Sequence, residues 1–228
     1  MSQLTVFTAG NKLVQFGDIM MRYPSSLVAL HLEDNRLSSF HENSFSGQTS
    51  LELIQLGRNK IQSITGKLFH ELINLFRLSL FDNKIEEIMD KAFEHCVQLR
   101  FLDLSVNKLK TLTKFTLYNL NQLEELNLSK NKIQFIEAGA FQSFHHLKQL
   151  DLSDNNLQVV SQGSFHGCRS VFSLRLHHSM VREIEPGALN HFTSLSSLDI
   201  SDNYLSDSEA WTQLETLTQL NTLNLSGK

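Results

Sequence analysis

The stretch Leu123–Phe141, LEELNLSKNKIQFIEAGAF, sets the pattern that most of this 228-residue chain follows. With Asn131 as a marker, steps of 24 residues meet an Asn or, once, a Ser. The series is Asn11, Asn35, Asn59, Asn83, Asn107, Asn131, Asn155, Ser179 and Asn203. Only the last step, to Lys228, needs 25 residues. A fixed period of this length indicates a solenoid built from repeated units.

The two halves of the unit predict its structure. An LxxLxL segment precedes each regular marker, and its alternating apolar residues predict a short half-buried strand that stacks in parallel with its neighbours. The second half returns the chain along the outside. It places an apolar residue ten positions after the marker, in the column Phe45, Phe69, Phe93, Leu117, Phe141, Phe165 and Leu189. The fold class is therefore α/β: one solenoid over residues 1–228, of about nine units, with a parallel sheet on the concave face and irregular or short helical return segments on the convex face.

The marker side chains predict a buried hydrogen-bonded ladder. An Asn side chain offers two N–H donors and a carbonyl acceptor to backbone groups that the turning chain leaves unpaired. The ladder residues are Asn35, Asn59, Asn83, Asn107, Asn131, Asn155, Ser179 and Asn203. Ser179 offers only a hydroxyl and follows His177 and His178, so we expect the ladder to be weaker there.

The consensus LxxLxLxxNxIxxIxxxxFxxL resembles the "typical" leucine-rich repeat of animal proteins, and it covers nearly the whole chain. Similar arrays occur in Toll-like receptors, Slit proteins, the Nogo receptor, small leucine-rich proteoglycans and insect leucine-rich immune proteins. The resemblance is specific for the fold, whereas one fold hosts many functions. It implies a protein-binding module that is part of an extracellular receptor or of a secreted immune or guidance protein and that binds through its concave face.

Composition excludes several other function classes. Charge is nearly balanced, with 20 Lys and Arg against 24 Asp and Glu, so no overall field favours nucleic acid. No apolar run reaches the length of a membrane span, and we expect no membrane insertion. The segment His70–Asn74 approaches the HExxH zinc motif but ends in Asn. We therefore expect no enzymatic activity, no catalytic residue, no metal and no cofactor.

Cys96 and Cys168 lie thirteen residues after a marker, where other units place core residues. Three strand spacings separate them, which is about 14 Å and too far for a disulfide. We predict two buried free thiols. The Cys-rich caps common in secreted relatives are absent from this sequence, which leaves two interpretations: a fragment of an extracellular protein, favoured by the phenylalanine-type unit, or a cytoplasmic scaffold or regulatory subunit. Uncapped ends also predict weak self-association.

The solvent-facing strand positions predict the binding surface. Phe81 and Phe101 are aromatic side chains among small polar residues, and Arg77 adjoins Phe101. Arg175 lies between two aspartates, which cross-strand charge pairing also explains. The candidate ligand-binding residues are Arg77, Phe81, Phe101, Asp103, Asp151, Arg175 and Asp199.

Other positions carry secondary hypotheses. The stripe Lys60, Lys84, Lys108 and Lys132 suggests sulfated-polyanion binding, although nearby acidic residues offset it. Asn127 and Asn224 begin Asn-Leu-Ser glycosylation sequons, a sequence that the repeat itself also generates.

Three further patterns stand outside the regular units. In the weak first unit the period places Val6 at an inward Leu position. Ser206 and Glu209 form a capping-box pattern that predicts a short helix, with Trp211 as a packing residue. A set of histidines falls on return segments, where we expect solvated or turn roles rather than metal ligation: His145, His146, His166 and His191.

Overall fold

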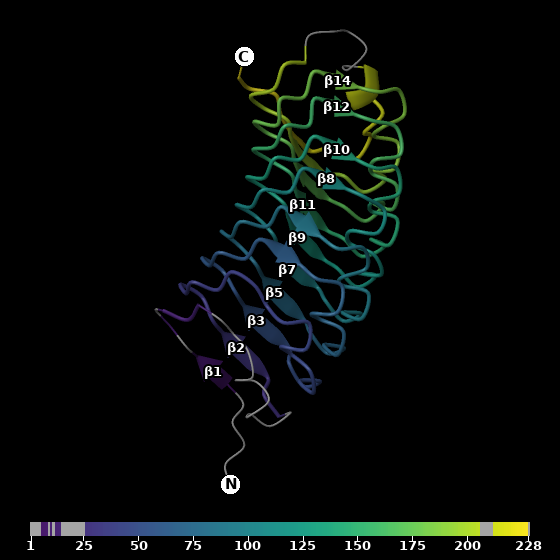
Figure 1. Cartoon of the computed structure of the whole chain (residues 1–228). Helices are drawn as coiled ribbons and strands as arrows, with labels where there is room; N and C mark the ends of the chain where they lie inside the picture. The colour runs from purple at the N-terminus through teal and green to yellow at the C-terminus, as the bar shows by residue number, and fades with distance from the viewer. Residues whose placement is uncertain (1–5, 9, 11, 15–25, 206–211, 228) are drawn as a thin grey trace.

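The computed structural model describes residues 6–8, 10, 12–14, 26–205 and 212–227. These residues form a curved stack of coils that runs from the N-terminal to the C-terminal units (Figure 1). Each coil adds one short strand to a parallel sheet whose strand order follows the sequence. The strands are β1 (Val6–Thr8), β2 (Ala29–His31), β3 (Leu53–Gln55), β5 (Arg77–Ser79), β7 (Phe101–Asp103), β9 (Glu125–Asn127), β11 (Gln149–Asp151), β13 (Ser173–Arg175), β15 (Ser197–Asp199) and β16 (Thr222–Asn224). The predicted solenoid with a parallel sheet is confirmed.

The register of the first unit differs from the prediction. Phe7, not Val6, pairs with the buried Leu30, and Phe7 packs against the core while Val6 is half exposed. Leu13 keeps the regular spacing, since its N–H donates to the Asn35 side chain 22 residues on, as in later units. The first unit is thus one residue shorter between strand and return segment. The larger ring buries more apolar surface than Val6 would.

The return segments contain a second row of strands that the sequence interpretation did not anticipate. Each of these strands has two residues, and they form three parallel pairs. The second residue of each strand lies five positions after the marker and is buried, because its apolar side chain faces the core. They are β4 (Ser63–Ile64), β6 (Glu87–Ile88), β8 (Thr111–Leu112), β10 (Phe135–Ile136), β12 (Val159–Val160) and β14 (Glu183–Ile184). Residues 212–214 are helical. The capping-box residues Ser206 and Glu209, with Trp211, lie outside the described residues, as does Asn11.

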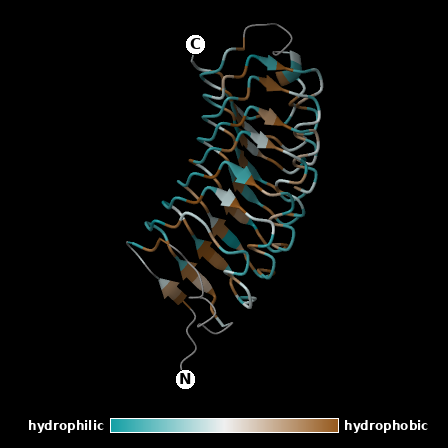
Figure 2. Cartoon of the chain, in the orientation of Figure 1, coloured by the Kyte–Doolittle hydropathy of each residue, from teal (hydrophilic) through white to brown (hydrophobic). Residues whose placement is uncertain are grey.

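The core lies between the two rows of strands. The predicted outer column is fully buried, and its phenylalanines stack in runs: the Phe45–Phe69 and Phe69–Phe93 ring centroids are 5.9 and 5.5 Å apart, and the Phe141–Phe165 centroids 6.0 Å. Leu117 interrupts the stack and is equally buried. Figure 2 shows the resulting alternation of brown and teal within each coil.

The marker side chains form a buried ladder. Asn59 is representative: its Nδ2 donates to the carbonyls of Leu32 and Leu56 at 2.8 and 3.0 Å, and its Oδ1 accepts from the Leu37 N–H at 3.0 Å. The same set of bonds recurs at Asn83, Asn107, Asn131, Asn155 and Asn203. Each Asn therefore joins its own coil to the preceding one.

The ladder is interrupted at Ser179. Its hydroxyl donates to the Leu152 carbonyl at 2.9 Å. Among the described residues, however, no side chain accepts from the Leu157 N–H, as Asn155 does from the Ile133 N–H one coil earlier. The backbone also differs here. His178, the residue before the marker, is left-handed as in the other units, but Met180, the residue after the marker, has a positive φ of 61° as well. The Ser179 N–H instead donates to Asn203 Oδ1 at 3.1 Å.

Both cysteines are buried free thiols, as predicted. Burial raises the pKa of the Cys96 thiol to about 12 and raises that of Cys168 as well. Because the thiolate is the reactive form, both side chains are chemically protected in the folded chain.

Restoring the ladder is expected to stabilise the chain. Ser179→Asn should raise the free energy of unfolding by about 1 kcal/mol, since it returns an acceptor to Leu157 and a second donor to the turn. The reciprocal Asn155→Ser should lower it by about 1–3 kcal/mol. Urea denaturation followed by circular dichroism measures both. If Ser179→Asn gives no gain, the loop around Met180 is committed to a different backbone path.

The thiols provide a second test of packing. We expect both cysteines to resist a thiol reagent in the native chain at mildly alkaline pH and to react together once the chain is unfolded in denaturant. Mass spectrometry of the modified protein counts the labels. Rapid labelling of either thiol under native conditions would contradict the burial described for it.

Candidate functional site

A groove of about 320 Å³ lies on the concave face of the sheet, over strands β3 to β13. Five of the candidate binding residues line it: Arg77, Phe101, Asp103, Asp151 and Arg175. The parallel register places Arg77 beside Phe101 and Asp151 beside Arg175 on adjacent strands. Phe81 and Asp199, the other two candidates, lie outside the groove lining.

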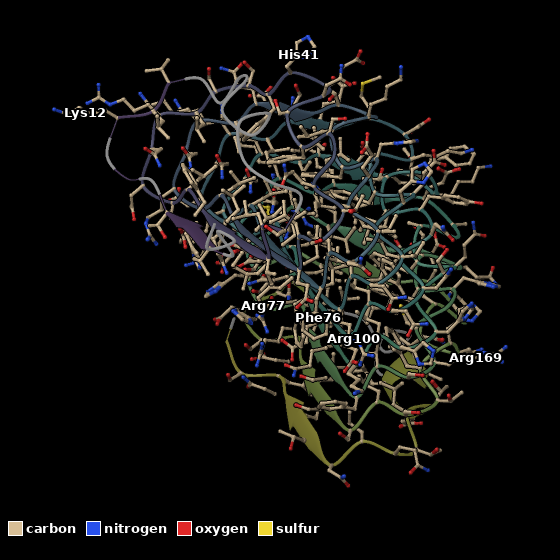
Figure 3. The ribbon with its side chains drawn as sticks, turned by 90° about the horizontal axis from the view of Figure 1, so that it is seen from below. Lys12, His41, Phe76, Arg77, Arg100 and Arg169 are labelled. Atoms are coloured by element: carbon tan, nitrogen blue, oxygen red, sulfur yellow. The ribbon has the colours of Figure 1, made fainter. Side chains whose placement is uncertain are left out.

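Four side chains at one margin of the groove form an aromatic–arginine cluster, which consists of Phe76, Arg77, Arg100 and Phe101. The Arg77 guanidinium carbon lies 3.9 Å from the centroid of the Phe101 ring, and that centroid lies 5.2 Å from the Phe76 centroid. Arg100 lies 5.7 Å from the Phe76 ring. Figure 3 labels Phe76, Arg77 and Arg100, which lie together in that view. Stacking on Phe101 holds the Arg77 guanidinium over the sheet with its N–H groups available.

Sequence reasoning missed Phe76 and Arg100. They precede their strands, at a position that other units fill with Glu52, Glu124 and Lys148. Phe76 remains 41% exposed despite its ring contacts. An aromatic side chain among charged residues at one repeat position was the available signal. It extends the candidate surface from the sheet onto its flank.

An ion-pair network holds the outer side of the cluster. Glu124 accepts from Arg100 and from Lys148, each at 2.6 Å. The hydrogen bond from Lys148, followed by the one from Arg100, lowers the pKa of Glu124. Because Glu124 stays ionised, Arg100 is held against the Phe76 ring.

Phe81 and Arg58 make a separate contact nearer the N-terminal units. The Phe81 ring lies over Gly57, where a Cβ would approach the ring to 3.2 Å, so the missing side chain makes room for it. Arg58 lies 5.7 Å from the ring and forms a two-point ion pair with Asp34, at 2.6 and 2.8 Å. Phe81 is consequently half-buried, and less available to a partner than Phe76.

The aspartates of the concave face have a structural role as well as a charge. Asp103 accepts from the Ser105 N–H at 2.9 Å and from its hydroxyl at 2.6 Å. Asp151 and Asp199 accept in the same way from the Ser two residues on. Asn127 accepts from the Ser129 N–H at 3.0 Å, and Asn224 from Ser226. The carboxamide therefore closes the same turn without a charge.

The charges of the groove are only partly paired. Arg175 lies 3.4 Å from Asp151, whereas Asp199 lies 3.7 Å from His177, so the expected arrangement of Arg175 between two aspartates gives an ion pair with Asp151 only. Among the described residues no cation pairs with Asp103 or Glu125. Two neighbouring strands thus present uncompensated carboxylates beside the stacked Arg77.

The lysine stripe is partly neutralised. Lys108 donates to Glu86 at 2.9 Å, and that hydrogen bond lowers the Glu86 pKa, with smaller contributions from the Lys108 charge and the neighbouring lysines. Lys60, Lys84 and Lys132 are exposed. Within the described part of the chain no group of three His, Cys, Asp or Glu residues could hold a metal ion. No helix there is long and apolar enough to cross a bilayer.

The double role of the aspartates can be separated by mutation. Asp103→Asn should change the free energy of unfolding by less than about 0.5 kcal/mol, because the amide oxygen can still accept from Ser105. Asp103→Ala should cost about 1 kcal/mol, since the turn loses its acceptor. Chemical denaturation compares the two variants. Equal losses in both would show that the charge, not the hydrogen bonds, matters for folding.

The leucine-rich repeat family matches residues 25–85, 49–109, 73–133, 102–157 and 121–181, which together span residues 25–181. A sequence comparison with curated proteins returns no significant match.

Three solved structures illustrate the structural likeness. TLR13 in complex with ssRNA13 superposes with a TM-score of 0.82 and 28% identity over 92% of this chain. A chain in the octameric complex of Latrophilin 3, Unc5D and FLRT2 superposes with a TM-score of 0.78 and 21% identity over 96% of this chain. A chain in the Drosophila Toll–Spatzle complex superposes with a TM-score of 0.72 and 24% identity over 85% of this chain. At 21% and 24% identity, the likeness to these last two structures establishes the fold alone. This chain spans 33%, 75% and 27% of those three chains.

Proposed function

The chain belongs to the leucine-rich repeat family, and we propose that it is a protein-binding module whose partner docks on the concave groove and the adjacent aromatic–arginine cluster. The observation that carries this proposal is a set of charged side chains on β5 to β9 that have no ion-pair partner among the described residues. Arg77 stacks on Phe101. Within the described part of the chain Arg77 has no carboxylate partner, and neither Asp103 nor Glu125 has a cationic one. Aromatic and Arg side chains dominate protein-binding hot spots.

Charge indicates what the partner presents. The groove lining has three carboxylates, on Asp103, Glu125 and Asp151, against the guanidinium groups of Arg77 and Arg175. We propose a partner with a basic edge that faces Asp103 and Glu125 and an apolar residue that packs on Phe76. The excess of carboxylates argues against nucleic acid on this face, because phosphates would be repelled. The solved relatives include both kinds of complex: TLR13 with ssRNA13 and Toll with Spatzle.

Surface area explains why the flank is needed. The groove covers the six strands from β3 to β13. At about 4.8 Å spacing, with each strand exposing about five residues of about 3.3 Å, this part of the concave face measures about 480 Å². A standard interface buries about 800 Å² per partner. The exposed ring of Phe76 continues the surface beyond the sheet.

The cellular setting is part of the proposal. We propose that residues 1–228 act as one solenoid within an extracellular protein, either an ectodomain or a secreted recognition protein with an immune or guidance role. The likeness to TLR13 and the Asn224 sequon support this. The buried free thiols are equally compatible with the alternative, a cytoplasmic scaffold. A signal peptide encoded upstream of this segment would decide for the extracellular setting.

Glycosylation at Asn127 would compete with the proposed partner. Asn127 lines the groove between Asp103 and Asp151, so a glycan there would fill the space that the partner needs. We therefore propose that Asn127 is unmodified in the binding-competent chain, and that Asn224, near the end of the sheet, is the better acceptor.

Mutation of the cluster tests the binding site. A panel of purified secreted proteins is screened against the chain, and binding of the partner found is measured by calorimetry. Phe101→Ala and Phe76→Ala should each weaken binding by about 1–3 kcal/mol with little change in thermal stability, because both rings are partly exposed. The matched control is Phe172→Ala, since Phe172 is 42% exposed at the Phe76 position of a unit four coils later. Phe81→Ala should have a smaller effect.

Two results would overturn the proposed site. Normal binding by both aromatic variants would remove the cluster from the interface. The second result is normal binding by the aromatic variants together with loss of binding in the triple variant Lys84→Glu, Lys108→Glu and Lys132→Glu. It would show that the binding site is the lysine stripe and would favour a sulfated polyanion as the ligand.

A further inference from the structure

A second cavity, of about 250 Å³, lies on the return turns of three successive coils, away from the concave sheet. Its lining is Gln142, His145, His166, Gly167, Arg169 and His191, here called the histidine cavity. Arg169 lies at the rim of the view in Figure 3, apart from Arg77 and Phe76. These residues belong neither to the proposed protein-binding surface nor to the ladder.

Close packing of the turns brings the histidines together. Gly167 has a φ of 103°, and a side chain there would collide with the Phe141 carbonyl, so this turn packs directly on the preceding one. The ring centroids of His166 and His191 are 4.9 Å apart. Hydrogen bonds tie the neighbouring turns, from the Ser170 hydroxyl to the His145 carbonyl at 2.7 Å and from Thr193 to the Arg169 carbonyl at 3.2 Å.

The charge around this cavity is one-sided. Among its described lining residues there is no carboxylate: the first turn contributes Gln142 and His145, the second His166 and Arg169, and the third His191. Burial, followed by the positive charges of His166 and Arg169, lowers the pKa of His191. Protonation of the cavity therefore accumulates like charges that nothing in the lining compensates.

The same chain contains a matched pair of histidines with the opposite environment. His70 and His95 occupy the positions of His166 and His191 in earlier units, and their ring centroids are 4.1 Å apart. There Glu94 lies 3.5 Å from His95 Nε2. The earlier pair thus has its own carboxylate, whereas the later pair has none among the residues that the structure describes.

We propose that the histidine cavity is a pH-dependent binding site for a phosphate or sulfate group. The imidazolium N–H groups of His166 and His191, the guanidinium of Arg169 and the amide of Gln142 are the donors, and such charge-assisted donors suit a tetrahedral oxyanion. A cation is disfavoured, because Arg169 repels it. The sign of the pH effect follows: an anion binds the protonated cavity, so affinity rises as pH falls through the histidine range and is lost above it.

Inorganic sulfate tests the proposal, because it keeps its charge across the relevant pH range. Titration is followed by the imidazole NMR signals at about pH 5.5 and about pH 7.5. We expect saturable shifts of the His166 and His191 signals, with binding at least about tenfold tighter at the lower pH, or ~1.4 kcal/mol. Arg169→Ala and His191→Gln should each weaken binding at the lower pH several-fold, and His95→Gln should leave it unchanged.

Three outcomes would overturn the site. They are the absence of saturable shifts at the lower pH, equal affinity at the two pH values, and equal losses in His95→Gln and His191→Gln. Arg169 is exposed, so Arg169→Ala keeps the test informative even if His191→Gln perturbs its turn. Titration with phosphorylated and sulfated oligosaccharides under the same conditions then shows whether the group is recognised free or as part of a larger ligand.

Discussion

The buried Asn ladder is the constraint on which the rest of this structure depends. Every coil must turn sharply after its strand, and the turn leaves backbone N–H and carbonyl groups inside the molecule, where an unpaired group costs about 1–3 kcal/mol. One Asn side chain satisfies three of them and reaches across to the preceding coil. The ladder therefore fixes the stacking of each unit on the one before it, and with it the register of the sheet.

Regular stacking has a consequence for the surface. Because each coil repeats every 24 residues, side chains at equivalent positions form columns, and substitution within a column changes the surface without disturbing the core. The concave aspartates illustrate this: Asp103 and Asn127 close the same turn through the same hydrogen bond to a Ser, yet only one carries a charge. The scaffold thus leaves charge free to vary where a partner would contact it.

Departures from regularity collect in the two halves of the chain for different reasons. Near β5 and β7 aromatic residues replace charged or small ones, which produces the aromatic–arginine cluster and the Phe81 contact over Gly57. Near β13 the irregularity is in the ladder: Ser179, the left-handed Met180 and the histidines around them alter the turn itself. His178 lies 3.8 Å from Asp154 and 3.4 Å from Asp202, so its ring lies near a carboxylate of each neighbouring coil, beside the position where the Asn is missing.

The sequence by itself determined the repeat, the ladder, the buried Phe column and the free thiols, because each depends on the period and on the burial of apolar or hydrogen-bonding residue types. Only the tertiary structure decided the one-residue shift that buries Phe7, the paired strands of the return segments, the inclusion of Phe76 and Arg100 beside Phe101, and the contrast between the His70–His95 and His166–His191 pairs. These features depend on side-chain directions and distances between residues of adjacent coils. Periodicity assigns a residue to a column, but packing decides which neighbour its side chain meets.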